Sequence, residues 1–552
     1  MLKVFAKQTA SMHTRDNIRL DADIYRPDAD GKFPVLLMRQ PYGRAIASTV
    51  VYNHPTWYAA QGYIVVIQDV RGRGTSEGEF KLFVNEIADG EDSVNWAANL
   101  PGSNGKVGMY GFSYQGMTQL YAAVAKPAAL KTICPAMIGY DLYTDWAYEG
   151  GAFCLQTNLA WAIQLATETA RLQKDEKAYH QLLAASRNLP LTNPEILKYF
   201  APDSFYHEWV EHFQADQYWQ KLSPKTHLKD VDLPMFHIGG WFDTYLRGTL
   251  HLYNDMAAQS QYRQQLLIGP WAHLPWGRKV GAVDYGVNAM SPVDKMQIAW
   301  FDQFLKDGNT DLPEQPLVWL FEMVSNMWLN FPTIPKLNQK SYFLSTTGLA
   351  SMREDEGILG ATCPETCIND VLVHDPWRPV PALGGHAAMP AGSFERSHID
   401  CRSDVLTYTS EPLIKDLHLA GEVAVEIWCT ADKSSFDLCA VLSEVYRDGS
   451  VYNLTQGYVR YQNVNNCISA KIKLQATCAK IVAGNALRLS LSAACFPAYG
   501  MNFGTSEVMN KENLINAQII TLSVSCGGNC PSQVLLPVVA PFELKLIKIN
   551  SI

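Results

Sequence analysis

The first 140 residues alternate between short apolar runs and segments with helical periodicity. The runs FPVLLMR (33–39) and YIVVIQD (63–69) are almost wholly apolar, which is typical of parallel strands buried on both faces. EDSVNWAANL (91–100) and SYQGMTQLYAAVAK (113–126) have the spacing of helices, and KVGMYG (106–111) predicts a strand between them. This alternation predicts an α/β architecture.

The pattern changes twice further along the chain. Residues 142–231 have helical periodicity and no strand signal, whereas α/β character returns with the strand-like runs LPMFHIGG (233–240) and RQQLLIGP (263–270). A helical block between two α/β stretches predicts a cap over one edge of a sheet. We therefore expect one α/β domain made of residues 1–141 and 232–340, with the cap inserted between them.

After residue 340 short alternating strands and frequent turns take over. AVEIWCTAD (424–432) is one such strand, and the Asp448-Gly449 pair between two further strands is a hairpin signal. Strands of this spacing over some 200 residues predict an antiparallel sandwich of the jelly-roll type at residues 341–552.

Composition narrows the class of partner. The chain has 552 residues, of which 47% are hydrophobic and 18% charged, and its net charge is −9 with no basic block. A nucleic acid or an anionic membrane is therefore not an expected partner. The N-terminal residues lack the pattern of a signal peptide, and no apolar run is long enough to span a membrane. We expect a cytoplasmic protein that acts on a small molecule, with a homodimer left open.

The 12 cysteines are scattered, so buried free thiols are the expected state. Two pairs, Cys363/Cys367 and Cys526/Cys530, have C-x-x-x-C spacing, which four thiolates of a zinc site would use. About 160 residues separate the pairs and the spacing is common by chance. We expect neither a metal nor a cofactor.

Two serines compete for the role of nucleophile. Ser76 lies in a strict G-x-S-x-G match, GTSEG (74–78), but it follows its strand by several residues and opens no clear helix. Ser113 has a looser match, GFSYQG (111–116), between a predicted strand and a predicted helix. A nucleophile elbow needs this strand–turn–helix context, because the helix N-terminus directs free N–H groups at developing negative charge. The context favours Ser113, and Ser76 is expected in a hydrogen-bonded loop.

Gln115 departs from the elbow pattern, since the second residue after the nucleophile is usually small. Gly111 gives the clearance that the crowded turn needs, and the Gln115 side chain is expected to point away from the preceding strand.

Two further residues complete a triad in chain order. Asp243 follows the strand at 233–240, and His273 follows the strand at 263–270; in α/β-hydrolases the acid and the histidine come in this order after the serine. His237 lies within a strand, as a core residue would, and His251 lies on a helix. The HEWVEH segment (207–212) has i, i+5 spacing, which places its two rings on different sides of a helix rather than at one zinc ion.

With these residues in hand, the chain resembles the cocaine esterase and X-Pro dipeptidyl-peptidase type of acyl hydrolases, which includes cephalosporin acylases and α-amino-acid ester hydrolases. The resemblance spans nearly the whole chain and rests on these stretches: RQPYGR (39–44), QDVRGRGTSEGEF (68–80), DGEDSVNWAANLPGSNGKVGMYGFSYQG (89–116), GGWFD (239–243), GPWAH (269–273), HDPWRPVPALGG (374–385) and RSDVLTYTSEPL (402–413). The family elbow is G-x-S-Y-x-G, which accounts for Gln115. The resemblance implies an α/β-hydrolase core with an inserted helical cap and a C-terminal β jelly roll.

The resemblance also implies roles for individual residues. Ser113, Asp243 and His273 stand at the triad positions, Tyr42 stands at the oxyanion-hole tyrosine, and Tyr114 supplies a backbone N–H. The residues that match the substrate pocket are Trp146, Trp161, Tyr245 and, from a looser match near Ala388, Met389. Without the resemblance, aromatic residues in a cap are more often core.

The implied activity is hydrolysis of an ester or amide through an acyl-enzyme, with an apolar acyl group. Asp145 matches a cap carboxylate that holds a substrate ammonium in the α-amino-acid ester hydrolases, alone or with Glu149. From the residues alone, a solvated or capping carboxylate is the favoured alternative for Asp145. The two other family carboxylates are replaced by Tyr245 and Leu246. An X-Pro dipeptidyl-peptidase, an α-amino-acid ester hydrolase and an acyltransferase remain alternatives. A non-enzymatic alternative is an inactive core with a ligand-binding jelly roll.

Overall fold

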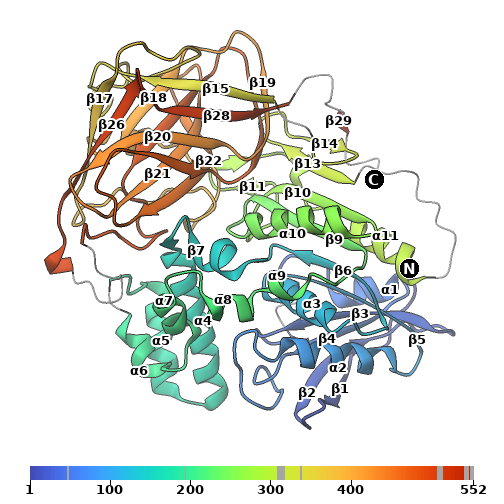
Figure 1. Cartoon of the computed structure of the whole chain (residues 1–552). Helices are drawn as coiled ribbons and strands as arrows, with labels where there is room; N and C mark the ends of the chain where they lie inside the picture. Colours follow the sequence, from blue (N-terminus) through green and yellow to red (C-terminus); the bar gives the residue numbers. More distant parts are fainter. Residues whose placement is uncertain are drawn as a thin grey trace.

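The computed structural model has three parts, which Figure 1 shows as a blue-to-green α/β domain, a teal helical cap and a yellow-to-red β-sandwich. It describes residues 1–45, 49–192, 194–306, 317–335, 338–505, 514–539 and 546–547. Within these residues no helix has the length and apolar composition needed to cross a membrane.

The α/β domain is built on one 11-stranded sheet with the strand order β1-β2-β4-β3-β5-β6-β9-β10-β13-β14-β29. The strands from β4 to β13 pair in parallel, and the outer strands pair antiparallel. The strand bounds are β1 Gln8–His13, β2 Arg19–Tyr25, β3 Phe33–Gln40, β4 Ile64–Asp69, β5 Ser103–Phe112, β6 Leu130–Ala136, β9 Met235–Phe242, β10 Gln264–Ala272, β13 Val318–Glu322, β14 Met327–Phe331 and β29 Leu546–Ile547.

Helices cover both faces of this sheet, because its central strands are apolar on both sides. In β3, Leu36 and Met38 pack into one apolar cluster and Val35 and Leu37 into another. Helices α1 and α11 pack on the first face, and α2, α3 and α10 on the second. Their bounds are α1 Pro55–Ala60, α2 Glu86–Ala98, α3 Tyr114–Val124, α10 Leu246–Gln259 and α11 Val293–Leu305. The predicted doubly covered parallel sheet is confirmed.

The cap lies between β6 and β9 in the chain. It begins with a π-helical turn, η2, and two short strands, and it continues through six helices within the described residues. The bounds are η2 Tyr143–Ala147, β7 Tyr148–Glu149, β8 Ala152–Phe153, α4 Leu155–Gln173, α5 Glu176–Arg187, α6 Glu195–Phe200, α7 Phe205–Glu211, α8 Gln217–Leu222 and α9 Pro224–His227. Within the helical block predicted at 142–231, α4 and α5 are two separate helices, because Lys174 adopts a left-handed conformation and Asp175 caps α5.

The C-terminal part is a sandwich whose strands pair almost throughout in antiparallel fashion. The predicted hairpin at Asp448-Gly449 joins β21 to β22. The strand bounds are β15 Asn338–Ser345, β16 Ile358–Gly360, β17 Ile368–His374, β18 Leu406–Ser410, β19 Leu417–Gly421, β20 Ala424–Ala431, β21 Phe436–Val445, β22 Val451–Tyr461, β23 Ile468–Lys473, β24 Thr477–Ile481, β25 Ala486–Ser492, β26 Ile520–Gly527, β27 Cys530–Pro531 and β28 Gln533–Val538. Shorter elements are β11 Lys279–Val280, β12 Val283–Asp284, η3 Val287–Ala289, α12 Ser397–Asp400 and η4 Leu514–Asn516.

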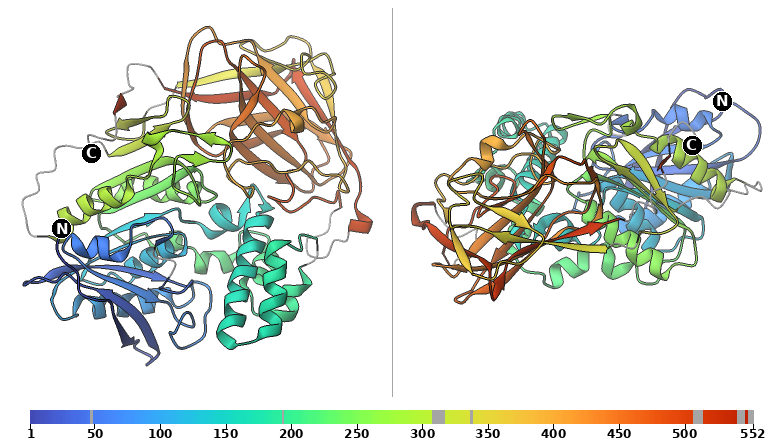
Figure 2. Two further views of the ribbon diagram at one scale, coloured as in Figure 1. Left: turned by 180° about the vertical axis from the view of Figure 1, so that it is seen from behind. Right: turned by 90° about the horizontal axis from the view of Figure 1, so that it is seen from above.

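The sandwich packs against both other parts, as the two views of Figure 2 show. Its apolar core is continuous with one face of the α/β domain. The Gln475 side-chain amide donates hydrogen bonds to the main-chain oxygens of Trp241 and Asp243 (both 3.0 Å). On the cap side, the Arg460 N–H donates to the Gly150 carbonyl (2.8 Å). The expected boundary at residue 341 omits one feature: β29, near the C-terminus, pairs with β14 of the α/β sheet.

Candidate active site

Ser113 occupies a sharp turn between β5 and α3. Its backbone has φ 59° and ψ −128°, a conformation that an L-residue adopts only when its surroundings enforce it. The Ser113 N–H donates to the Ala136 carbonyl of β6 (2.9 Å), which holds the turn against the neighbouring strand. Ser113 lines a large cavity. The strand–turn–helix context predicted for this serine is confirmed.

The prediction that the Gln115 side chain points away from the preceding strand is wrong. The side chain folds back so that its Oε1 accepts a hydrogen bond from the Phe112 N–H (3.3 Å). A Cβ on Gly111, where φ is +136°, would lie 2.4 Å from the Gln115 Cβ. A Cβ on Gly116 would lie 2.4 Å from Ile138. Gly111 therefore leaves room for the Gln115 side chain, and Gly116 leaves room for the end of β6 and the residues after it. A glutamine fits two residues after the serine because its side chain binds the backbone of the turn.

Asp243 and His273 meet at the carboxyl ends of neighbouring parallel strands. Asp243 follows β9 and His273 follows β10, and the His273 Nδ1 lies 2.8 Å from the Asp243 Oδ1. Asp243 is fully buried, whereas the His273 side chain is 29% exposed and lines the same cavity as Ser113. A carboxylate at Nδ1 fixes the proton on that nitrogen, so Nε2 is left to act as an acceptor.

Tyr42 lies just beyond β3, and its hydroxyl accepts a hydrogen bond from the Trp161 Nε1 of the cap (3.1 Å). Burial raises the Tyr42 pKa to about 12, so the phenol keeps its proton and can donate it as a hydrogen bond. Tyr114 is the first residue of α3, where a backbone N–H has no intrahelical acceptor. Its own hydroxyl is occupied with Glu86 (2.8 Å).

The cavity is about 830 Å³ and lies where all three parts of the molecule meet. Three groups of residues line it: Tyr42, Val50, Phe112, Ser113, Gln115, Phe242, Thr244, Tyr245, Ala272, His273, Leu274, Pro275, Lys279, Val280 and Gly281 from the α/β domain; Trp146, Thr157, Ala160, Trp161 and Gln164 from the cap; and His386, Ala388, Met389, Pro390, Ala391 and Phe394 from the segment between β17 and α12. A chamber of this size accommodates a drug-sized organic molecule.

Aromatic rings form one wall of the cavity. Trp146 contacts Tyr245 with ring centroids 4.1 Å apart and Trp161 with centroids 5.2 Å apart. The Tyr245 ring meets the His273 imidazole edge-on at 5.0 Å. Met389 also lines the cavity and belongs to the segment between β17 and α12. Its N–H donates a hydrogen bond to Gln156 of α4 (3.0 Å). The structure thus brings the four pocket residues expected from the resemblance to one chamber.

Asp145 is not among the residues that line the cavity. It is fully buried, and its carboxylate bonds to the His251 Nδ1 (2.9 Å) and to the Asp141 N–H (2.8 Å). The expected role as an ammonium-binding carboxylate is therefore corrected: Asp145 braces η2 against α10. His251, which the sequence left on a helix, is its partner.

Glu149 belongs to a buried polar cluster that the sequence gave no sign of. Its Oε2 contacts the Arg247 Nη1 (2.6 Å), the His386 Nε2 (2.8 Å) and the Tyr499 hydroxyl (2.5 Å). Burial alone would raise the Glu149 pKa, but Arg247 and His386 hold it well below its usual range. The four residues come from the cap, the α/β domain and the sandwich, so no local pattern joins them. The cluster fixes His386 in the cavity wall.

The remaining sequence candidates lie elsewhere. Ser76 is in a hydrogen-bonded loop, as expected, with its hydroxyl bonded to the Asp69 carbonyl and the Asp21 N–H. His237 is buried, bonded to Gln264 (2.9 Å), and burial lowers its pKa to about 4. In the HEWVEH segment, the His207 and His212 rings bond to Ala201 and Asp216 respectively.

The cysteines are free thiols in the described structure, and seven of them are buried as expected. Four others are exposed, namely Cys363, Cys367, Cys401 and Cys467. Among the described residues, no three His, Cys, Asp or Glu side chains are arranged to hold a metal ion.

Comparison with known proteins identifies the sequences and folds to which this chain is similar. Residues 16–275 match the family of X-Pro dipeptidyl-peptidases (S15 family), and residues 304–535 match the X-Pro dipeptidyl-peptidase C-terminal non-catalytic domain. The cocaine esterase of Rhodococcus sp. (strain MB1 Bresler) is 30% identical over 95% of this chain and 97% of its own length. A putative serine esterase of Mycobacterium bovis is 24% identical over 81% of this chain and 79% of its own.

Two solved structures have the same fold over almost the entire chain. An aminopeptidase from the marine sediment archaeon Thaumarchaeota archaeon superposes with a TM-score of 0.81 at 22% identity, covering 97% of both chains. An α-amino acid ester hydrolase superposes with a TM-score of 0.79 at 22% identity, covering 98% of this chain and 97% of its own. At this level of identity the two likenesses show the fold alone.

Proposed function

Since the chain belongs to the X-Pro dipeptidyl-peptidase (S15) family of serine hydrolases, we propose that it cleaves an ester or amide bond through a triad of Ser113, His273 and Asp243. The observation that carries this proposal is the 2.8 Å contact between the His273 Nδ1 and the Asp243 Oδ1, beside a cavity into which the Ser113 elbow opens. As an enzyme, the chain is not the inactive binding protein that the sequence left open.

The chemistry follows from the hydrogen-bond geometry. The Ser113 Oγ attacks the substrate carbonyl while the His273 Nε2 takes its proton, and the buried Asp243 carboxylate stabilises the imidazolium that forms. The His273 imidazolium then protonates the leaving group, which departs and leaves the acyl group on Ser113. Water attacks this acyl-enzyme in the same manner, with His273 as the base, and releases the acid.

The negative charge on the carbonyl oxygen needs donors during both steps. The Tyr42 hydroxyl is suited to this task because Trp161 already satisfies its oxygen, so its proton is directed elsewhere. The Tyr114 N–H at the start of α3 is the second donor, and the positive end of the helix favours the anion. One donor of this kind typically contributes about 10²–10³ in rate.

The cavity supports an apolar acyl group. Trp146, Trp161, Tyr245 and Met389 contribute aromatic and aliphatic surface to it, and none of the described lining residues is an Asp or Glu. A substrate ammonium would enter this site without a carboxylate partner, which is costly in a buried environment. An esterase or amidase for uncharged acyl groups is therefore favoured over an α-amino-acid ester hydrolase or an X-Pro dipeptidyl-peptidase.

The test is a comparison of substrates with wild type and Ser113→Ala. We expect kcat/KM for phenyl and benzoyl esters to exceed that for glycyl-prolyl anilides, and activity on both to vanish in the variant. Higher activity on the anilides would overturn the assignment of an uncharged acyl group and favour the peptidase. Adding amine acceptors and looking for amide products separates acyl transfer from hydrolysis, because both use the same acyl-enzyme.

A further inference from the structure

Asp69, the last residue of β4, is a fully buried carboxylate outside the triad. Its Oδ1 accepts hydrogen bonds from the Gln40 Nε2 (3.1 Å) and the Arg44 backbone N–H (2.7 Å). Its Oδ2 accepts from the Arg44 Nη1 (2.5 Å) and, at 3.4 Å, lies within reach of the Thr75 N–H. A buried carboxylate with a paired cation and several donors fixes those donors in place, because losing any of them leaves charge unsatisfied.

The groups bound by Asp69 flank Tyr42 on both sides. Gln40 comes two residues before Tyr42 and Arg44 two residues after it. The Gln40 side chain also closes a bridge, since its Oε1 accepts a hydrogen bond from the Tyr42 backbone N–H (2.8 Å). One carboxylate therefore holds the main chain at two points. It binds the Arg44 N–H directly, and it holds the Tyr42 N–H through the Gln40 side chain.

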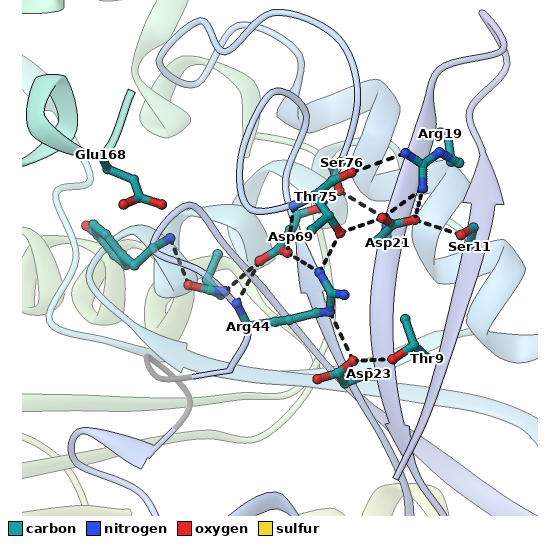
Figure 3. A network of polar contacts seen from close by, with 12 residues as sticks. Thr9, Ser11, Arg19, Asp21, Asp23, Arg44, Asp69, Thr75, Ser76 and Glu168 are labelled. Atoms are coloured by element: carbon teal, nitrogen blue, oxygen red, sulfur yellow. Dashed lines mark hydrogen bonds and ion pairs between the residues drawn. The ribbon is translucent and has the colours of Figure 1, made fainter. Parts of the chain in front are cut away.

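The glycine-rich loop after β4 encloses Asp69, as Figure 3 shows. A Cβ on Gly74, where φ is +58°, would lie 1.9 Å from the Asp69 Oδ2, so only glycine leaves room for the carboxylate. The Ser76 hydroxyl donates to the Asp69 carbonyl (2.8 Å) and accepts from the Asp21 N–H (2.9 Å). The strict GTSEG match is thus part of the wall around Asp69.

Arg44 links Asp69 to the outer strands of the sheet. Its Nε donates to the Asp23 Oδ1 (3.0 Å), and its Nη1 donates to the Thr75 Oγ1 (2.9 Å). The Thr75 hydroxyl in turn donates to the Asp21 Oδ2 (2.5 Å). Asp21 lies in the same network as Asp69 but makes none of the contacts that reach the backbone around Tyr42.

We propose that Asp69 is a positioning residue for the reaction: through Gln40 and Arg44 it sets the backbone on either side of Tyr42, and so the place at which the Tyr42 hydroxyl meets the oxyanion. This inference rests on the oxyanion role proposed for Tyr42. A hydrogen-bond donor works in catalysis only when it is already in place, and a displacement of about 1 Å costs up to about 10²-fold in rate.

The direct test is Asp69→Asn. The variant keeps the shape and one acceptor oxygen, but it sets a neutral amide donor against the Arg44 Nη1. We expect kcat, measured per phosphonate-titrated active site so that misfolded protein does not count, to fall about 10-fold to 100-fold with KM within about three-fold of wild type. The matched control is Asp21→Asn, which neutralises a carboxylate of the same network and should leave kcat within about two-fold. Equal losses in the two variants would overturn the inference.

A double-mutant cycle with Tyr42→Phe separates positioning from general damage. If Asp69 acts through the Tyr42 hydroxyl, Asp69→Asn should lower kcat little further once that hydroxyl is gone. Should Asp69→Asn lower kcat by the same factor in both backgrounds, the positioning role is wrong while the oxyanion role of Tyr42 stands. If Tyr42→Phe alone leaves kcat unchanged, the proposed oxyanion role fails first and this inference falls with it.

Gln40→Met provides an independent variant in case Asp69→Asn does not fold. Methionine matches glutamine in length but breaks both the bond to Asp69 and the bond from the Tyr42 N–H. We expect the same fall in kcat and the same absence of a further effect in the Tyr42→Phe background. A Gln40→Met enzyme with the wild-type kcat would contradict the inference.

Discussion

Two glycine-flanked serines follow buried parallel strands on either side of β3, and only one of them has the geometry of a nucleophile elbow. Ser113 follows β5, adopts a strained turn and opens the 11-residue helix α3 toward a cavity. Ser76 follows β4 and uses its hydroxyl twice, once as a donor and once as an acceptor. The Ser76 proton is donated to a main-chain carbonyl and not to a base, so this hydroxyl is not prepared for attack on a substrate. The comparison teaches that availability of the hydroxyl matters more than spacing of the glycines.

The glycines around the two serines answer different steric needs. Gly111 and Gly116 clear the Gln115 side chain and strand β6, so that the elbow can close against its neighbour. Gly74 clears the Asp69 carboxylate, and Gly78 clears the Arg71 side chain at 2.8 Å. The glycines of the strict G-x-S-x-G match are therefore required by close packing around the buried Asp69 carboxylate and the Arg71 side chain. The glycines of the looser match are required by close packing within a strand–turn–helix elbow.

Ser113→Ala is expected to have the largest effect among the variants that test this difference between the two serines. The variant should lose covalent labelling by a fluorophosphonate and about 10⁶-fold in kcat, because a triad without its nucleophile retains only binding and oxyanion stabilisation. Intact-mass measurement after labelling checks this. Label that persists in Ser113→Ala but disappears in Ser76→Ala would reverse the assignment of the two serines.

Asp243→Asn should give the next largest effect, about 10⁴-fold in kcat, because an amide donor at the His273 Nδ1 favours the wrong imidazole tautomer. Steady-state kinetics on a phenyl ester measures the loss, and an unchanged melting temperature shows that the fold is intact. A loss of less than ten-fold would mean that another group orients His273.

The proposed triad could be derived from the sequence because each of its members follows a strand, and the carboxyl ends of parallel strands lie at the same edge of a sheet. The three-part architecture could also be predicted, because the hydrophobic periodicity changes at the boundaries between the α/β domain, the helical cap and the β-sandwich. The sequence did not predict that Gln115 folds back, because the room for it exists only when Gly111 and the turn are already in place.

Contacts between distant parts of the chain could not be predicted from the sequence either. Glu149 joins Arg247, His386 and Tyr499, and Asp145 joins His251, through packing between domains. Asp69 bonds to Gln40 on the adjacent strand β3 and to Arg44 just beyond it, and nothing in the spacing of charged residues indicates this pairing. The buried polar contacts were therefore the part that required the structure.

Gly111→Ala tests the elbow through stability rather than rate. The added Cβ would overlap the Gln115 Cβ at 2.4 Å in a backbone region that strains L-residues, so we expect about 2–5 kcal/mol of destabilisation. Gly105→Ala is the matched control: φ is +85° there and nothing lies within 4 Å of a Cβ, so about 1 kcal/mol is expected from backbone strain alone. Loss of phosphonate labelling on heating, compared for both variants, measures the difference. Equal melting shifts would show that the Gln115 contact is not what requires Gly111.

Gly74→Ala applies the same steric change to the Ser76 loop. Because its Cβ would displace the Asp69 carboxylate, we expect a fall of about 10-fold to 100-fold in kcat per labelled site, with labelling of Ser113 still present. The comparison with Gly111→Ala is informative since one glycine borders the proposed nucleophile and the other borders the residue proposed to position the oxyanion donor. A Gly74→Ala enzyme with the wild-type kcat would separate this loop from catalysis.

Ser76→Ala should have the smallest effect of the series. The substitution removes the donor to the Asp69 carbonyl and leaves the N–H of the buried Asp21 without its acceptor, which costs about 1–2 kcal/mol of stability. The kcat should stay within about three-fold of wild type, because Ser76 binds the main chain of Asp69 and not the carboxylate that holds Gln40 and Arg44. A melting curve and a single kcat measurement test both statements. A lower melting temperature with an unchanged kcat would place Ser76 in the framework around Asp69, whereas a kcat loss equal to that of Asp69→Asn would mean that the main-chain position of Asp69 is what governs Tyr42.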